Sequence, residues 1–145
     1  MPHFSYTYRV TYADCAMGNH VYYGRYLGLL EAARGEFFRH LGFTFQHWQD
    51  RQTIFPVVEC RLRYRAPARY DDLLAIALYP SLARGVRLNF AYHVLNQQPQ
   101  LLTEGETCHV CTGLDEKPKR LPRELEALLA PWLPAADSAT VPNTG

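Results

Sequence analysis

The longest helical pattern in the chain lies near its N-terminus and constrains the fold more than any other feature. Between Tyr23 and Leu41, apolar residues recur at spacings of three and four, which is the period of a helix with one apolar face. The residues in this series are Tyr26, Leu30, Ala33, Phe37 and Leu41, and Leu27, Leu29 and Phe38 widen the apolar face. A face this broad predicts a helix wrapped by other structure, and Gly42 is well placed to end it.

The rest of the chain reads mainly as strands. Residues 4–12 alternate before the helix, and strand patterns follow a loop at 43–53. We predict these later strands at 54–66, 72–84, 86–97 and 100–113, separated by Pro67, Gly85 and Pro99. No helical pattern lies between them, so we expect an antiparallel meander. Residues 122–129, with Pro122 in the first turn, predict a short final helix.

These elements predict a single α+β domain at residues 1–134, followed by a disordered tail at 135–145. A chain of 145 residues has room for one ordinary core. One long apolar helix is the natural cover for a curved antiparallel sheet of about five strands. The free edge of such a sheet must be protected from uncontrolled pairing, so we expect a homo-oligomer.

Composition and charge exclude several classes of protein. The net charge is +1 and no block of like charges is present, which argues against a nucleic-acid partner despite the closely spaced Arg61, Arg63, Arg65 and Arg69. No apolar run is long enough to span a membrane, and Met1 to Val10 lacks the apolar core of a signal peptide. We therefore expect a cytoplasmic protein without a membrane span.

The cysteines do not predict a metal site. Cys108 and Cys111 are spaced like half a zinc site, but they lie in a strand pattern, where residues three apart point to opposite faces. No second Cys or His pair completes a site, so we expect reduced structural thiols, no metal and no cofactor.

Several motifs resemble one known family in the same order along the chain. Asp14-Cys15-Ala16-Met17-Gly18-Asn19-His20-Val21-Tyr22-Tyr23-Gly24-Arg25-Tyr26-Leu27 resembles the opening motif of the 4-hydroxybenzoyl-CoA thioesterase family. Further matches are Glu31-Ala32-Ala33-Arg34, Leu41-Gly42, Tyr64-Arg65-Ala66-Pro67-Ala68-Arg69-Tyr70-Asp71-Asp72 and Lys119-Arg120-Leu121-Pro122. The resemblance implies a hot-dog fold, assembly as dimers or tetramers, active sites at the dimer interface and hydrolysis of acyl-CoA thioesters.

The start of the long helix is where we expect this chemistry. The first amides of a helix lack internal partners, so they can stabilise the oxyanion that forms when a thioester is attacked. The resemblance points to the amides of Tyr22, Tyr23 and Gly24 as donors. The rings of Tyr22 and Tyr23 line the acyl pocket or pack in the core. Candidate ligands for the CoA phosphates are Arg65, Arg69 and Arg87, with a solvated surface as the alternative role of each.

The attacking group departs from the family pattern. The second Asp of the family's Asp-x-Asp pair aligns with Ala16, while the first aligns with Asp14. Three residues are candidates for the missing role: Asp14, His20 and Glu59. Each has a structural alternative, since Asp14 can form a turn, His20 can order the loop, and Glu59 can pair with a neighbouring Arg. A further carboxylate, Glu31, is more typical of a surface or interface pair with Arg34.

Three functions are compatible with these features. Acyl-CoA thioester hydrolysis is the main hypothesis. A hot-dog dehydratase or hydratase is the second, because Asp14 and His20 are the residue types that such enzymes pair. The third is a non-catalytic domain that binds acyl-CoA or an acyl carrier, which Ala16 favours.

Overall fold

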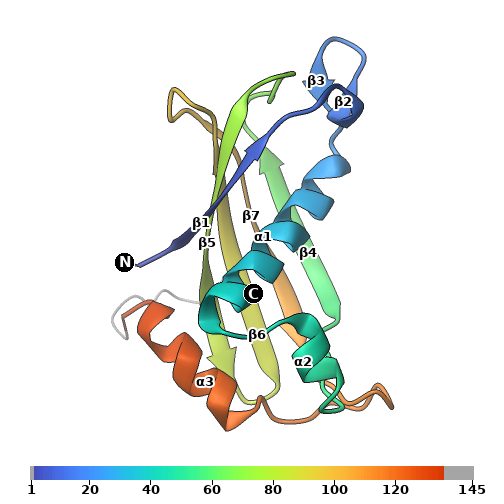
Figure 1. Cartoon of the computed structure of the whole chain (residues 1–145), viewed down its shortest axis with the longest axis vertical. Helices are drawn as coiled ribbons and strands as arrows, with labels where there is room; N and C mark the ends of the chain where they lie inside the picture. The colour runs from blue at the N-terminus through green and yellow to red at the C-terminus, as the bar shows by residue number, and fades with distance from the viewer. Residues whose placement is uncertain (1, 136–145) are drawn as a thin grey trace.

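The computed structural model describes residues 2–135 and confirms the α+β architecture (Figure 1). A single long helix, α1 (Arg25–Leu41), crosses one face of a five-stranded antiparallel sheet. The shorter helices α2 (Phe45–Gln49) and α3 (Arg123–Leu129) lie at the end of the sheet towards which α1 runs. The predicted tail at 135–145 lies outside the described residues, except for Ala135.

The sheet has the order β1-β5-β6-β7-β4, and every neighbouring pair is antiparallel. Its strands are β1 (Phe4–Arg9), β4 (Val57–Tyr64), β5 (Leu73–Arg84), β6 (Arg87–Leu95) and β7 (Leu101–Val110). The predicted meander is correct for β5, β6 and β7 but wrong for β4, which pairs with β7 instead of β5. Both edges of β5 are already used, one by β1 and the other by β6, so the remaining edge for β4 is that of β7.

The core lies between α1 and the sheet face that it covers. Along β5 the burial alternates, and Leu74, Ile76 and Leu78 are fully buried. Phe37 and Phe38 of α1 are buried as well, and each ring has an edge contact with Phe90 of β6. Complete burial of one such side chain stabilises the fold by about 1.5–3 kcal/mol. Most of the predicted apolar face of α1 is therefore buried, whereas Leu27 is 49% exposed.

The ends of α1 are defined by two glycines. Gly42 has φ 103° and caps the C-terminus, which confirms the predicted stop. At the other end Gly24 is the N-cap residue, and no side chain caps the first turn. No helix within residues 2–135 is long and apolar enough to cross a bilayer.

Helix α2 lies inside the segment that the sequence predicts as a loop. Thr44 caps it by accepting a hydrogen bond from the amide of His47 at 3.2 Å, and Trp48 is almost completely buried. A helix of five residues is too short to show a periodic pattern. The cap residue Thr44 was the one available signal.

Candidate active site at the start of the long helix

Three very short elements join β1 to α1 and shape the candidate site. A 3-10 turn, η1 (Tyr12–Asp14), leads into β2 (Cys15–Ala16), which pairs with β3 (His20–Val21). Cys15 and Val21 pack towards the core, so their neighbours Ala16 and His20 point outwards together. The connection needs positive φ at Gly18 (80°) and Asn19 (60°), residue types that accept this conformation.

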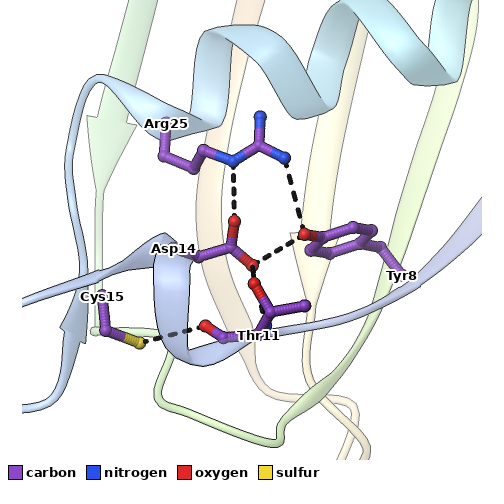
Figure 2. Close-up of polar contacts among 5 residues, drawn as sticks. All are labelled: Tyr8, Thr11, Asp14, Cys15 and Arg25. Carbon is purple, nitrogen blue, oxygen red and sulfur yellow. Dashed lines mark hydrogen bonds and ion pairs between the residues drawn. The ribbon is translucent and has the colours of Figure 1, made fainter.

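The carboxylate of Asp14 lies buried at the centre of a polar cluster (Figure 2). One oxygen accepts from Nε of Arg25 at 2.7 Å, and the other accepts from the hydroxyl of Tyr8 at 2.7 Å. The second oxygen also accepts from the amide of Thr11 at 2.7 Å and its hydroxyl at 3.0 Å. Asp14 thus ties β1, the η1 turn and the first turn of α1 together.

These partners fix the charge of Asp14. Burial alone raises the pKa of the carboxyl, but the hydrogen bonds from Arg25, Thr11 and Tyr8 together outweigh it and hold the pKa at about 2. The group is therefore a weak base, and both of its oxygens accept hydrogen bonds from the protein. The sequence left open whether Asp14 is the attacking group or forms a turn. In the structure it belongs to a 3-10 turn, which directs its side chain to Arg25 instead.

The expected amide donors at the start of α1 are not equivalent. The amide of Tyr22 donates to the carbonyl of Asp14 at 2.9 Å, so the expectation of a free donor there is wrong. Within residues 2–135 the amides of Tyr23 and Gly24 have no acceptor. They are unpaired donors at the positive end of a 17-residue helix.

A cavity of about 320 Å³ opens beside this helix start. Its lining includes His20, Tyr23, Tyr26, Tyr64 and Arg65. The hydroxyl of Tyr64 on β4 donates to the carbonyl of Tyr23 at 2.9 Å, which fixes the peptide that leads into Gly24. The structure thus brings one predicted catalytic residue, His20, next to the free helix amides.

A neighbouring ring fills the space that a side chain at position 24 would take. A Cβ atom at Gly24 would lie 2.8 Å from Cε2 of Tyr22, and the rings of Tyr22 and Tyr23 contact each other with centroids 4.8 Å apart. Both rings are exposed, at 51% and 65%, so they do not pack in the core. They form an aromatic rim at the mouth of the cavity.

The three predicted phosphate ligands are separated. Arg65 lines the cavity with its guanidinium paired to Glu104 at 2.9 Å. Arg69 is exposed in the nearby turn, whose next residue, Tyr70, donates its amide to Asn19 at 3.1 Å. Arg87 begins β6 at the other end of the sheet, beside Val110 of β7.

Glu59 is also distant from the helix start. It lies on the edge strand β4, 57% exposed, with a carboxylate oxygen 3.6 Å from Nε of Arg61. Tyr64 is five residues further along the strand, which is a distance of roughly 16 Å. Glu59 therefore has the alternative role that the sequence allowed, a pair with a neighbouring Arg on an exposed outer strand.

Two residues of this site were not identified from the sequence. Arg25 pairs with Asp14, and Gly28 leaves room for it, because a Cβ there would lie 2.6 Å from a guanidinium nitrogen of Arg25. Tyr64 reaches the site from β4, which is distant in sequence.

The described residues contain no cluster of three His, Cys, Asp or Glu side chains that could hold a metal ion. The two cysteines of the candidate half-site have different neighbours. Sγ of Cys108 lies 3.8 Å from Oε1 of Glu106, while Sγ of Cys111 lies 3.9 Å from the carbonyl of Arg120.

Comparison with known proteins assigns the chain to a family. Residues 10–132 match the model of the thioesterase-like superfamily. The chain is 36% identical over 125 residues to the acyl-CoA thioester hydrolase YbgC of Escherichia coli (strain CFT073), covering 86% of this chain and 93% of that protein. It is 32% identical over 126 residues to the acyl-CoA thioesterase YbgC of Haemophilus influenzae, covering 86% and 92%.

A solved structure shows the same fold. A hypothetical protein of Thermus thermophilus superposes with a TM-score of 0.82 at 30% identity, covering 88% of this chain and 98% of that one. The family match extends from the end of β1 to η2 (Ala130–Trp132), so it includes the η1 turn, the start of α1 and the whole of the sheet that follows. The chain therefore belongs to the thioesterase-like superfamily.

Proposed function

We propose that this protein hydrolyses acyl-CoA thioesters to the free acid and CoA at the start of α1. The observation that carries the proposal is a pair of unpaired amides, those of Tyr23 and Gly24, at a helix start lined by His20. Family membership supports the reaction type, and the names of the E. coli and H. influenzae relatives support the substrate class.

In the proposed mechanism the thioester carbonyl oxygen points at the two free amides. His20 takes a proton from water, and the resulting hydroxide attacks the carbonyl carbon. Negative charge develops on the oxygen, where the amides and the helix dipole stabilise it. The tetrahedral intermediate then expels the CoA thiolate, which recovers the proton from the His20 imidazolium. One water is consumed, and the products are the acid and the CoA thiol.

His20 is the favoured base because of its position. It is paired directly opposite Ala16, the position of the missing family carboxylate, and both residues face outwards. Opposed residues of an antiparallel pair have Cβ atoms about 4.5–5.5 Å apart, so an imidazole at one position reaches the space beside the other. Asp14 takes a positioning role through Arg25 and Tyr8, and Glu59 takes no part.

The groups around the cavity have corresponding roles in substrate binding. Arg65 and Arg69 bind the phosphates of CoA, since guanidinium groups suit phosphate geometry. Tyr22 and Tyr23 pack against the pantetheine part at the rim. Arg87 of the same chain is at the opposite end of β6 and does not take part in that contact.

We also infer that the protein works as a homodimer through β4. This strand ends the sheet, all but one of its residues are exposed, and Val57, Val58 and Tyr64 expose 47–57% of their surfaces. Pairing of β4 with its own copy would complete the unpaired edge. In a two-fold antiparallel pair the start of one β4 lies beside the end of the other.

The catalytic proposal is tested by steady-state release of free thiol from short, long and aromatic acyl-CoAs. We expect hydrolysis by the wild type and a loss of about 100-fold or more in kcat for His20→Ala, the usual contribution of a general base. His93→Ala is the matched control, because His93 is an exposed histidine on β6. If His20→Ala keeps full activity, His20 is not the base.

The same assay distinguishes the other functions. Binding of acyl-CoA without hydrolysis by the wild type identifies a non-catalytic domain, the function that Ala16 would favour. Hydration of an enoyl-CoA identifies a hydratase. The structure offers less support for a hydratase, because the Asp14 carboxylate is paired with Arg25 and not with His20.

The dimer is tested by sedimentation. Val58→Glu places a carboxylate on the exposed edge strand, so we expect monomers where the wild type forms dimers or tetramers. Leu114→Glu is the control, since Leu114 is 47% exposed in a loop after β7. Dimers that persist in Val58→Glu would exclude this interface.

We further propose a cytoplasmic location. All four cysteines of the chain are free thiols in the structure, which fits a reducing compartment. Cell fractionation followed by immunodetection tests this directly.

A further inference from the structure

A second cavity, of about 400 Å³, lies at the other end of α1 and has no role in the mechanism above. We call it the Arg34 chamber. Its lining includes Arg34, Phe38, Phe45, Phe55, Phe90 and His109. Most of the lining residues are apolar, and the polar side chains among them include one cation and one imidazole.

Arg34 is a buried cation without an acidic partner. The residue is 8% exposed, and none of the ion pairs formed among residues 2–135 includes it. The expected pair with Glu31 on the same helix is not formed. Its guanidinium donates from Nη1 to the hydroxyl of Tyr92 at 3.0 Å, the one side-chain hydrogen bond that Arg34 forms with the described part of the chain.

A chain of hydrogen bonds continues from Tyr92 across the sheet. The Tyr92 hydroxyl lies 2.7 Å from Oγ1 of Thr107, which lies 2.9 Å from Nε2 of His109. Nδ1 of His109 lies 3.0 Å from the carbonyl of Phe55. A carbonyl can only accept, so a neutral His109 donates from Nδ1 to Phe55 and accepts at Nε2 from the hydroxyl of Thr107. Thr107 in turn accepts from the hydroxyl of Tyr92, which accepts from Arg34.

This direction fixes the chemistry of the chamber. His109 is neutral, carries its proton on Nδ1 and uses Nε2 as an acceptor, so neither ring nitrogen is left for a ligand. Burial lowers the pKa of His109 to about 4, against the opposing effect of the Phe55 carbonyl. The positive charge of Arg34 is therefore not shared with His109, and the remaining guanidinium donors stay available.

A buried cation that lacks a counter-charge is costly, and a bound anion relieves the cost. A ligand that fits here must be apolar where it touches the phenylalanine rings and anionic where it meets Arg34. We propose that the Arg34 chamber binds the acyl part of the substrate and selects acyl groups that end in a carboxylate, that is, CoA monothioesters of dicarboxylic acids.

The inference rests on the proposed function and on the β4 dimer. Val57, at the start of β4, lines the chamber, and Tyr64, at its end, lines the cavity of the helix start. Antiparallel pairing of two β4 strands brings these ends together. The thioester held at the helix start of one subunit then has its acyl group directed to the Arg34 chamber of the other.

Glu31 is the internal competitor of such a ligand. It lines the same chamber, is exposed and lies one helical turn before Arg34. Its carboxylate repels a second carboxylate and competes for the guanidinium. Replacement by Gln removes both effects, so Glu31→Gln should strengthen the preference for carboxylated acyl groups.

The experiment compares acyl-CoAs that are matched in length. The pairs are glutaryl and pentanoyl, adipoyl and hexanoyl, and suberyl and octanoyl, with kcat/KM measured for each. In at least one pair the carboxylated substrate should be preferred by about 10- to 100-fold, the effect of a hydrogen bond to a charged group. Arg34→Met should remove this preference, so that the ratio of kcat/KM between the carboxylated and uncarboxylated members of the pair falls to about one or below.

Two further variants separate charge from packing. Arg34→Lys keeps the charge and should retain part of the preference. Arg39→Met is the matched control, because Arg39 is exposed on the same helix and pairs with Glu36. Thermal unfolding of Arg34→Met should show an unchanged or higher Tm, since replacing an uncompensated buried charge by an apolar side chain is neutral or stabilising.

A binding measurement separates this inference from the proposed function. Calorimetry with a carboxyalkyl-CoA thioether and an alkyl-CoA thioether of equal length needs no hydrolysis. Tighter binding of the carboxylated thioether, lost in Arg34→Met, supports the chamber even if no thioester is cleaved. Equal hydrolysis and equal binding of both members of every pair, unchanged by Arg34→Met, overturns the inference and leaves the hydrolase intact.

Discussion

Ala16 and His20 are paired directly opposite each other in the two-residue ladder of β2 and β3. Position 16, where the family carboxylate is absent, and the imidazole of His20 therefore lie on the same outward face. The proposed base therefore lies directly across the ladder from the position where the family carboxylate is expected. This relationship can be tested by placing a carboxylate at position 16 in a variant that lacks His20.

Ala16→Asp restores a carboxylate at the family position. In a His20→Ala background we expect it to recover at least about tenfold of the lost kcat, because the new carboxylate reaches the same space. Thiol release from the best acyl-CoA substrate measures the effect. Ala16→Asn in the same background is the control, since an amide of equal size is not a base. Equal rates in the two double variants would exclude the exchange of roles.

Asp14→Asn should destabilise the protein more than it changes the chemistry. The pKa of Asp14 is about 2 in the folded protein, against an ordinary value of 3.8. A depressed carboxyl pKa stabilises the fold above pH 4, and this contribution is lost as the pH falls from about 4 to about 2. The shift corresponds to about 2 kcal/mol in the free energy of unfolding at pH 7. Urea unfolding of Asp14→Asn and of the wild type checks this value.

The control for this variant is Asp71→Asn. The Asp71 side chain is exposed and its carboxylate lies 3.9 Å from Nη1 of Arg9, so its replacement should change the stability by less than about 0.5 kcal/mol. A loss for Asp14→Asn no larger than that of the control would show that the Arg25 cluster does not hold the η1 turn.

His109 should make the fold sensitive to mild acid. Its pKa is lowered from 6.5 to about 4 by burial, so between these values the unfolded chain binds a proton and the folded chain does not. The contribution of His109 to the free energy of unfolding is fully present above pH 6.5. It falls by up to about 3 kcal/mol as the pH decreases to 4. Urea unfolding at pH 7.5 and pH 5 measures it. His109→Gln should flatten this dependence, whereas His3→Gln, a change at an exposed histidine near the N-terminus, should leave it unchanged.

Gly105→Ala should loosen the outer strand β4. A Cβ at Gly105 would collide with the carbonyl of Arg61 and lie 2.5 Å from Cδ2 of Leu62, both on β4. Backbone shifts of this kind cost about 1–3 kcal/mol, and faster hydrogen exchange of the β4 amides should accompany the loss.

Gly35→Ala is the opposite case on α1. A Cβ added at position 35 would lie 3.5 Å from Cε2 of Phe45, which is an ordinary contact. Alanine also favours a helix by about 1 kcal/mol over glycine. We expect a higher Tm for Gly35→Ala and a lower Tm for Gly105→Ala. A change of Tm in the same direction for both variants would contradict the packing at one of these positions.

The sequence by itself determined the elements and the class of fold. The period of the apolar residues specifies α1, and alternation specifies the strands, because each pattern matches a repeat fixed by backbone geometry. The motif around Asp14 and His20 located the candidate site at the helix start. These patterns are local, so each can be recognised within a single segment of the chain.

The tertiary structure decided what depends on distant segments. The place of β4 beside β7 was not in the local pattern, and it is what exposes Glu59 and brings Tyr64 to the helix start. The η1 turn directed Asp14 to Arg25 and left His20 beside the free amides. Strand order and side-chain direction follow from packing across the whole core, which no single segment encodes.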